Sequence, residues 1–498
     1  MGKRTAPPRA SAMIEALRGL GYSTATAIAD IIDNSIAAGA NEVDIQFHWR
    51  GDESAILILD NGIGMDDAML DRAMRLGDRD PLEEREISDL GRFGLGLKTA
   101  SFSQARRLTV ASKFQGGAIE ALRWDLDYLR QDSSGDWTLL EGAEVGSESY
   151  ISLLRDRQQG TIVLWENMDR VTPTGATDQD FLDLIDTVER HLSVVFHRFI
   201  EERRLEIRIN DGKIAAWDPF LESRPDTWRS GLDRIWINGH QICVEGFVLP
   251  HKDRLPPKVY DDAAGPDGWT AQQGFYVYRN KRLLVGGHWL GLGRGRSWTK
   301  EEPFRLARIK LDIPNSADDD WKIDIRKSKA RPPLEARARL SLFAEDVRER
   351  ARKVFAFRGH YDRPSRTTAP VTAWRADHSA NGVRYRVDRT HPVVAAVLEN
   401  SALAQNDIIA MLRVVEETVP VQQIWLDTAE AKETPKTRFD GVPPDEIRSV
   451  LQTVFNNLVH RKGFTEEQAR RQLSATDPFD SWPDLIELMT ANPEENSR

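Results

Sequence analysis

The chain has 498 residues, of which 40% are hydrophobic and 29% charged, a composition typical of a globular protein with about two to four domains. Its net charge of −10 excludes nucleic-acid binding by the surface as a whole, so any DNA contact would need a local basic face. The single cysteine, Cys243, excludes an intramolecular disulfide framework and fits a reducing cytosol. We expect a cytoplasmic protein without membrane partners, because the sequence has neither a run of about eighteen apolar residues nor the apolar segment of a secretion signal.

Helices and short strands alternate over the first two hundred residues. Apolar spacing predicts helices within 11–38, broken near Gly19 to Ser23, and another helix over 180–200. Short runs of strand-forming composition predict five strands, at 42–47, 55–60, 107–112, 121–126 and 160–167. We expect these elements to form a first domain, residues 1–205.

The remainder of the chain divides into three parts. Residues 206–357 form a second block, which begins within the stretch "LEIRINDGKI", where an Asp-Gly dipeptide predicts a turn. Its strands precede a long helix at about 333–356, a pattern that indicates an α+β domain. Residues 358–392 have little periodicity and predict a basic linker or arm. Residues 393–498 predict a helical C-terminal domain.

The predicted arm combines arginine with aromatic residues. Tyr361, Trp374 and Tyr385 lie among seven arginines, at positions 358, 363, 366, 375, 384, 386 and 389. Such a segment can bind phosphates and stack on bases, or it can be a solvated linker that packs on its own protein. Both interpretations remain open from the residues alone.

The stretch "DIIDNSIAAGA" places polar side chains on an apolar helix. Asp30 and Asn34 are four residues apart and therefore share a face, with Asp33 to one side. A carboxylate and a carboxamide are suited to a water molecule and Mg²⁺, because small hard cations prefer oxygen ligands. The alternative is a solvated or capping pair.

Two glycine-containing stretches follow. In "LDNGIGM" a strand leads into Asp60, and Gly62 and Gly64 permit tight backbone paths, so the carboxylate can accept a hydrogen bond from an exocyclic amine such as that of adenine. In "GRFGLGLKTAS" three glycines lead into a predicted helix, and their exposed N–H groups, together with Lys98, indicate an anion site. The glycine order matches neither the Walker A loop nor the Rossmann fingerprint.

Together these stretches resemble the GHKL ATPases, which include gyrase B, the heat-shock ATP-dependent chaperone, histidine kinases and MutL. "GT" at Gly160 and Thr161, which begins a strand, resembles a fourth motif of that superfamily. The resemblance implies a Bergerat-type ATP-binding α/β sandwich in an α+β protein, with ATP and Mg²⁺ as cofactors. Asn34 would hold Mg²⁺ and Asp60 the adenine amine.

The resemblance also implies roles for the remaining motif residues. Three would line the adenine pocket beside Asp60 and Gly62, namely Gly64, Met65 and Thr161. Five would hold the phosphates, namely Gly91, Gly94, Leu95, Gly96 and Lys98. The polar run from about Asp66 to Leu90 would be a mobile lid over the nucleotide.

The second block resembles the transducer domain of MutL, gyrase B and the microrchidia (MORC) proteins. The stretches that carry this likeness are "GFYVYRNKRLL" and "WKIDIRKSKARPP". In those families a loop lysine reaches the γ-phosphate, and the resemblance implies that Lys329 does so here, with Lys327 as the alternative. A basic surface loop without such a role is the competing interpretation.

The opening helix departs from the family pattern. Family members usually carry glutamate at the position of Asp30, where it acts as general base on the attacking water, and aspartate at the position of Ala37. Aspartate is one methylene shorter, and a misplacement of about 1 Å can cost on the order of 10²-fold in rate. We therefore expect slow hydrolysis, unless the helix lies closer or Asp33 helps to polarise the water.

The leading functional hypothesis is an ATP-gated switch that forms a homodimer on ATP binding and acts on DNA or a DNA-handling complex. The stretches "AMRLGD" and "ISDLGRFGLGLKTASFSQ" most resemble the microrchidia branch and its bacterial relatives. For those relatives the resemblance implies partners encoded beside restriction or phage-defence genes. The alternatives are a chaperone-type ATPase on protein clients and a nucleotide-binding scaffold with little hydrolysis.

Overall fold

A computed structural model gives the fold of the chain, which divides into two compact units, Met1–Tyr361 and Asp362–Arg498. The described residues are 8–19, 21–77, 96–132, 134–173, 175–293, 295–324, 330–356, 373–379, 382–400, 405–417, 419, 444–476 and 478–491. The first unit contains both of the domains for which the sequence predicts sheets. We call them the first lobe (residues 8–213) and the second lobe (residues 214–356).

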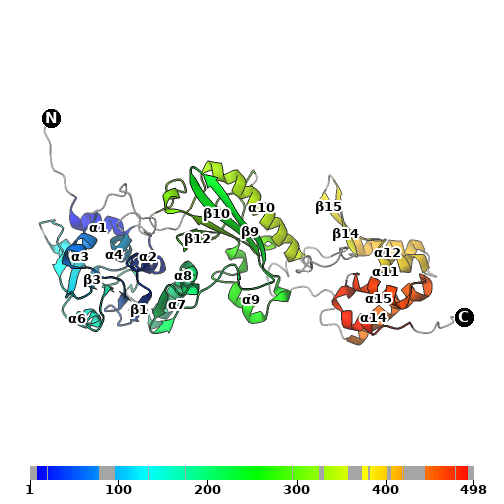
Figure 1. Ribbon diagram of the computed structural model, residues 1–498, viewed down its shortest axis with the longest axis horizontal. Helices are drawn as coiled ribbons and strands as arrows, with labels where there is room; N and C mark the ends of the chain where they lie inside the picture. Colours follow the sequence, from blue (N-terminus) through cyan, green and yellow to red (C-terminus); the bar gives the residue numbers. More distant parts are fainter. Residues whose placement is uncertain are drawn as a thin grey trace. The chain divides into compact units, whose positions relative to one another are not determined.

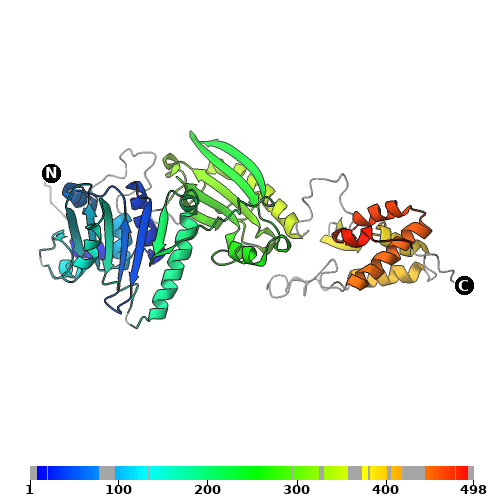
Figure 2. The same ribbon diagram turned by 60° about the horizontal axis from the view of Figure 1, so that its bottom comes forward.

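A mixed sheet forms the centre of the first lobe, and Figure 2 shows its strands side by side. In the described residues the strands lie in the order β5 (Leu140–Glu141), β4 (Ile119–Asp125), β3 (Arg107–Lys113), β6 (Gly160–Glu166), β2 (Ala55–Asp60), β1 (Glu42–His48), β7 (Glu206–Ile209) and β8 (Gly212–Lys213). Neighbouring strands run antiparallel except β1 and β7, which are parallel.

The two faces of this sheet are covered unequally. Along β2, Ile56 and Ile58 face the main core, whereas Leu57 and Leu59 face a smaller cluster on the other side, as the two-residue period of a strand requires. The helices that contribute to the main core are α1 (Ala10–Arg18), α2 (Thr24–Ala37), α3 (Asp67–Met74), α4 (Gly96–Gln104), α5 (Leu126–Gln131), α7 (Asp178–Val195) and α8 (His197–Glu201). The smaller cluster is covered by α6 (Glu148–Ile151) and the 3₁₀ turn Ser152–Leu154.

Helix α2 packs against α4 and α7 in the main core, and its ends are set by local sequence. Ser23 and Thr26 form a reciprocal capping box at the N-terminus, which satisfies backbone N–H groups that the helix leaves open. Gly39, with a φ of +75°, adopts a left-handed conformation just beyond the C-terminus. Alanines and isoleucines fill the buried face between these ends, so the helix is fixed over its whole length.

Two sequence-based expectations about the end of the first domain need correction. The strands at 206–213 belong to the first sheet rather than to the second lobe, because β7 pairs with β1. These two strands form a hairpin whose two-residue turn consists of Asn210 and Asp211, which both have positive φ. Ile209 therefore pairs with Gly212. The helix expected over 180–200 is broken at Phe196, which is fully buried and packs against Phe199.

The second lobe is a five-stranded sheet with one long helix, counted over its described residues. The strands lie in the order β12 (Arg282–His288), β11 (Gly274–Arg279), β13 (Ala307–Ile313), β10 (His240–Val248) and β9 (Trp228–Ile237). Helix α10 (Leu334–Ala356) packs on one face through Leu340 and Val347, and Figure 1 shows it along the sheet. Helix α9 (Pro257–Ala263) contributes Ala263 to the same core.

The described part of the second unit contains helices and one hairpin. Its described helices are α11 (Pro392–Asn400), α12 (Gln405–Glu417), α14 (Pro444–Asn456), the π-helical turn Asn457–Arg461, α15 (Glu466–Ser474) and α16 (Pro483–Glu487). The second half of the segment expected to be a linker instead forms the hairpin β14 (Trp374–Ser379) and β15 (Gly382–Val387), where aromatic and β-branched residues favour strands. Arg386 pairs with Glu416 of α12 at 2.8 Å, which attaches this hairpin to the helices.

The α+β class predicted from the sequence, with a helical C-terminal region, is confirmed. Among the described helices, none has the length and apolar character needed to cross a membrane.

The core of the second lobe allows a matched stability test. Leu340 is fully buried on α10, whereas Leu342 on the same helix is 60% exposed. Leu340→Ala should lower the free energy of unfolding by about 2–5 kcal/mol because it leaves a cavity, and Leu342→Ala should change it by less than about 0.5 kcal/mol. Urea unfolding followed by tryptophan fluorescence measures both values, and equal losses would contradict the packing described for α10.

Candidate functional site

Helix α2 carries two carboxylates into the protein interior and leaves one carboxamide open. Asp30 and Asp33 are buried, whereas Asn34, one turn from Asp30, is exposed. The hydroxyl of Tyr22 donates a hydrogen bond to Oδ2 of Asp30 over 3.0 Å. Burial, reinforced by the charge of Asp30, raises the pKa of Tyr22, so its hydroxyl stays protonated and remains a donor to Asp30.

Asp60 lies at the end of β2, where its carboxylate is held from three directions. Oδ2 accepts a hydrogen bond from Ser35 Oγ at 2.8 Å, and Oδ1 accepts from the N–H groups of Gly62 at 2.9 Å and Thr161 at 3.2 Å. Burial raises the pKa of Asp60, while these three hydrogen bonds act in the opposite direction. The carboxylate is therefore fixed in orientation by α2, by the turn after β2 and by β6.

The turn after Asp60 leaves no room for a side chain at positions 62 and 64. Gly64 has a φ of +69°, and a Cβ atom there would lie 2.0 Å from the carbonyl oxygen of Lys113. A Cβ atom on Gly62 would lie 2.9 Å from the Cβ of Ala38. The two glycines therefore let this turn pass close to both α2 and β3.

A hydroxyl from β3 joins the turn to β6. Ser112 Oγ accepts a hydrogen bond from the N–H of Met65 at 2.8 Å and lies 2.9 Å from Thr161 Oγ1. In the sheet register Thr161 is opposite both Asp60 and Ser112. The five residues predicted from two separate motifs to contact adenine are thus brought together: Asp60, Gly62, Gly64, Met65 and Thr161.

Near the middle of α2, the N-terminus of α4 approaches Asp30. Helix α4 begins at Gly96, and a Cβ atom on Gly96 would lie 3.8 Å from Oδ2 of Asp30. Lys98 is buried, and its ammonium donates to the carbonyl oxygens of Ala73 at 2.9 Å and Arg75 at 2.7 Å, at the end of α3. The other predicted phosphate and γ-phosphate contacts lie outside the described residues, namely Gly91, Gly94, Leu95, Lys327 and Lys329.

Four residues of this region were not identified from the sequence. Tyr22 bonds to Asp30, Ser35 bonds to Asp60, and Ser112 bonds to Met65 in the turn after β2. Arg282 of β12 pairs with Asp33. Single hydroxyls are common in helices and strands, so their residue types carry no signal. Arg282 stands in the stretch "RNKRLL", but its partner is 249 residues away in the sequence.

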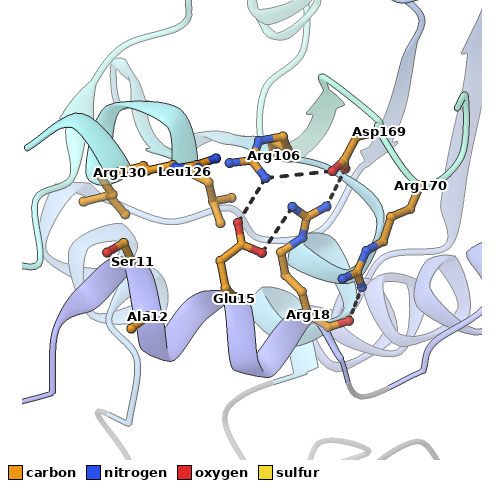
Figure 3. A pocket seen from close by; sticks show the side chains of 10 residues that line it. Ser11, Ala12, Glu15, Arg18, Arg106, Leu126, Arg130, Asp169 and Arg170 are labelled. Carbon is orange, nitrogen blue, oxygen red and sulfur yellow. Dashed lines mark hydrogen bonds and ion pairs between the residues drawn. The ribbon is translucent and has the colours of Figure 1, made fainter. Parts of the chain in front are cut away.

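A separate hollow of about 550 Å³ lies beside α1 and is lined by the ten residues drawn in Figure 3. There the buried Arg18 donates to the carbonyl oxygen of Phe102 at 2.9 Å and pairs with Asp169. Arg106 pairs with Glu15 of α1 at 3.0 Å (Figure 3). No predicted nucleotide contact lines this hollow, so we assign these residues to anchoring α1.

A cluster of metal-ligand residue types is formed by two residues of α8 and by Asp218. Among the described residues, one ligand atom each of His197, Glu201 and Asp218 lie within 4.8 Å of one another. Nε2 of His197 bonds to the hydroxyl of Tyr278 at 2.7 Å, and the two carboxylate oxygens of Asp218 accept backbone N–H groups at 2.8 and 2.6 Å. We therefore assign this cluster to the packing between α8 and the second lobe.

Comparison with known proteins agrees with the geometry around α2. Residues 22–161 match the model of a family described as histidine kinase-, DNA gyrase B-, and HSP90-like ATPase. The DNA mismatch repair proteins MutL of Rickettsia akari and Rickettsia felis are each 29% identical to this chain over 93 residues. These matches cover 18% of this chain and only 15% of the length of each MutL protein.

The matched segment contains α2, the turn after β2 and the start of β6, which are the elements that assemble around Asp60. The comparisons therefore support placing residues 22–161 in the GHKL ATPase superfamily.

Proposed function

We propose that this protein is an ATP-binding, slowly hydrolysing switch that dimerises when ATP binds and acts on DNA or on a DNA-handling complex. The observation that carries the proposal is that a single helix contributes to both ends of the site. Ser35 of α2 bonds to Asp60, the expected adenine acceptor, while Asp30 of α2 faces Gly96 at the N-terminus of α4. A nucleotide lying along α2 would meet an amine acceptor at one end and an anion-binding helix terminus at the other.

In this proposal the residues around Asp60 hold the base. The carboxylate accepts the adenine amine, and the glycine turn, Met65 and Thr161 line the pocket. The phosphates lie at the N-terminus of α4, held by Gly96 and Lys98 with Gly91, Gly94 and Leu95, and Lys329 contacts the γ-phosphate. The bonds from Lys98 to the end of α3 would then be exchanged for phosphate contacts.

Magnesium fits the open carboxamide of Asn34. Its oxygen is a hard ligand on an exposed side chain, one turn from Asp30 and on the same face of α2. When bound, Mg²⁺ would neutralise phosphate charge and orient the phosphate chain for attack by water.

Asp30 is the proposed general base. Its carboxylate can take a proton from the attacking water, and the hydrogen bond from Tyr22 restricts its orientation. Because aspartate has the shorter side chain, we propose that hydrolysis is slow and that nucleotide occupancy, more than turnover, sets the state of the protein.

Substitutions at Asp30 separate binding from hydrolysis. Asp30→Asn should leave ATP affinity within about threefold but lower kcat at least about 100-fold, since an amide cannot accept the proton. Asp30→Glu should raise kcat by about tenfold or more by extending the base towards the water. Phosphate release under saturating ATP measures both, and turnover of tens of ATP per second that Asp30→Glu does not accelerate would contradict slow hydrolysis.

Asp60 should determine recognition of the base. Asp60→Asn should weaken ATP binding by about 10- to 150-fold, the effect of losing a hydrogen bond to a charged group. The unsubstituted chain should prefer ATP to GTP, because guanine has a carbonyl where adenine has the amine. Equilibrium binding of a fluorescent ATP analogue with unlabelled competitors measures this, and Asp52→Asn, in an exposed loop, is the control. Equal affinities of Asp60→Asn and Asp52→Asn would contradict the assignment.

The role in DNA handling rests on the similarity to MutL and on the resemblance to the microrchidia branch. We propose a cytoplasmic protein whose partners are DNA and proteins of a restriction or phage-defence system. The arginines in the expected arm would supply a local basic surface on a chain of net charge −10.

Nucleotide-dependent dimerisation provides the test of this switch. A non-hydrolysable ATP analogue with Mg²⁺ should shift the full chain from monomer to dimer in light scattering, and DNA retention should fall steeply as salt is raised. ADP serves as the control. Nucleotide binding without a shift in mass would favour a scaffold, and protection of unfolded clients without DNA binding would favour a chaperone-type ATPase.

A further inference from the structure

The tip of the β11–β12 hairpin in the second lobe is rich in positive charge. Arg279 and Arg282 pair across a two-residue turn in which Asn280 and Lys281 have φ values of +47° and +70°. Such a turn fixes the register of the flanking strands. The position of Arg282 is therefore set by the backbone of the second lobe.

Each cation of this tip pairs with an acid on a different element. Arg279 pairs with Asp318 within the second lobe at 2.5 Å, and Lys281 pairs with Glu202, just after α8. Arg282 reaches α2 in the first lobe. The hairpin tip thus joins the two lobes at the helix that carries the proposed base.

Arg282 contacts both buried carboxylates of α2. Its Nε lies 3.1 Å from Oδ2 and 3.3 Å from Oδ1 of Asp33, and its Nη2 lies 3.7 Å from Oδ1 of Asp30. The side chains of Arg282, Asp33 and Asp30 are 4%, 1% and 4% exposed. Nη1 donates to the carbonyl oxygen of Leu283 at 2.8 Å, which fixes the plane of the guanidinium group.

Because this cluster is buried, the electrostatic interactions within it are strong and depend on its geometry. Water does not screen charges this deeply buried, and removing one member deprives the others of an ion-pair partner. Oδ2 of Asp30 is held by Tyr22 of the first lobe, whereas Oδ1 faces Arg282 of the second lobe. The two oxygens of the proposed base are therefore oriented by different lobes.

We propose that Arg282 is a positioning residue for ATP hydrolysis: through its shared contact with Asp33 it holds the Asp30 carboxylate, so that the orientation of Asp30 depends on the placement of the second lobe. This inference rests on the proposed ATPase function. It assigns to β12 a part in the reaction that is separate from the expected γ-phosphate contact of Lys329.

A second ion pair between the lobes provides a control that separates a structural role of Arg282 from a role in positioning Asp30. Arg198 of α8 pairs with Asp312 of β13 at 2.5 Å, and its guanidinium carbon lies 4.8 Å from the centre of the Tyr278 ring. This pair also joins the lobes, but neither residue contacts Asp30 or Asp33 in the described structure. Loss of either arginine should weaken the lobe contact, whereas only loss of Arg282 should disturb the base.

The test compares Arg282→Met, Arg282→Lys, Arg198→Met and Asp33→Asn in the full chain. The measurements are single-turnover ATP hydrolysis, the dissociation constant of a non-hydrolysable ATP analogue, and thermal unfolding. Arg282→Met should lower the hydrolysis rate at least about tenfold while analogue affinity stays within about threefold, a split expected for a residue that acts on the chemical step. Arg282→Lys should recover part of the rate, and Arg198→Met should stay within about twofold of the unsubstituted chain.

The double variant Arg282→Met with Asp33→Asn tests whether the pair acts as a unit. Its rate should be no more than about twofold below that of the slower single variant, because residues that act through one contact are not additive. An unchanged or increased rate for Arg282→Met would overturn the proposal, as would equal rate losses in Arg282→Met and Arg198→Met. Failure of the unsubstituted chain to bind the ATP analogue would refute the proposed function itself, and the binding measurement distinguishes that result.

Discussion

The burial of two carboxylates, Asp30 and Asp33, on one helix is the constraint on which the rest of the site depends. An isolated buried charge costs several kcal/mol, so each must meet donors or a cation. Tyr22 supplies a hydroxyl from the segment before α2, and Arg282 supplies a guanidinium from the second lobe. The requirement for partners therefore ties α2 to segments eight and about 250 residues away in the sequence.

The same helix also fixes the adenine end of the proposed site. Ser35 bonds to Asp60, and the turn beyond Asp60 passes so close to α2 and β3 that only glycine is tolerated at position 64. Ser112 then links this turn to β6. The contacts come from a helix and three adjacent strands rather than from loops alone, and such supports hold functional groups more precisely.

The join between the lobes gives the second lobe a physical connection to the proposed chemistry. Charged pairs made by Arg282, Lys281 and Arg198 join α2 and the α8 region to the second lobe. Buried aromatic residues such as Phe220 and Tyr278 reinforce this contact, with Val194 of α7 packed against them. A shift of the second lobe would therefore act on the helix that carries Asp30.

Local patterns were sufficient for much of the fold and for part of the site. The apolar spacing within 11–38, with its break near Gly19 to Ser23, predicts α2, because this signal acts over a few residues. For the same reason the strand at 55–60 is predicted from its own residues, and it ends at Asp60. The boundary after residue 205 and the helix expected to continue through Phe196 were wrong in detail, since strand pairing and burial of Phe196 prevail over local spacing. The hairpin within the expected arm was missed for the same reason.

By itself the sequence determined the short segments in which we expect the nucleotide contacts: the Asp30 and Asn34 pair, the Asp60 turn and the helix that begins at Gly96. Each of these depends on backbone conformation and side-chain chemistry within one short segment. Only the tertiary structure decided that Ser35 reaches Asp60 and that Arg282 reaches Asp33. Those contacts join residues far apart in the chain, and whether two such groups meet depends on how sheets and helices pack, which a local pattern does not encode.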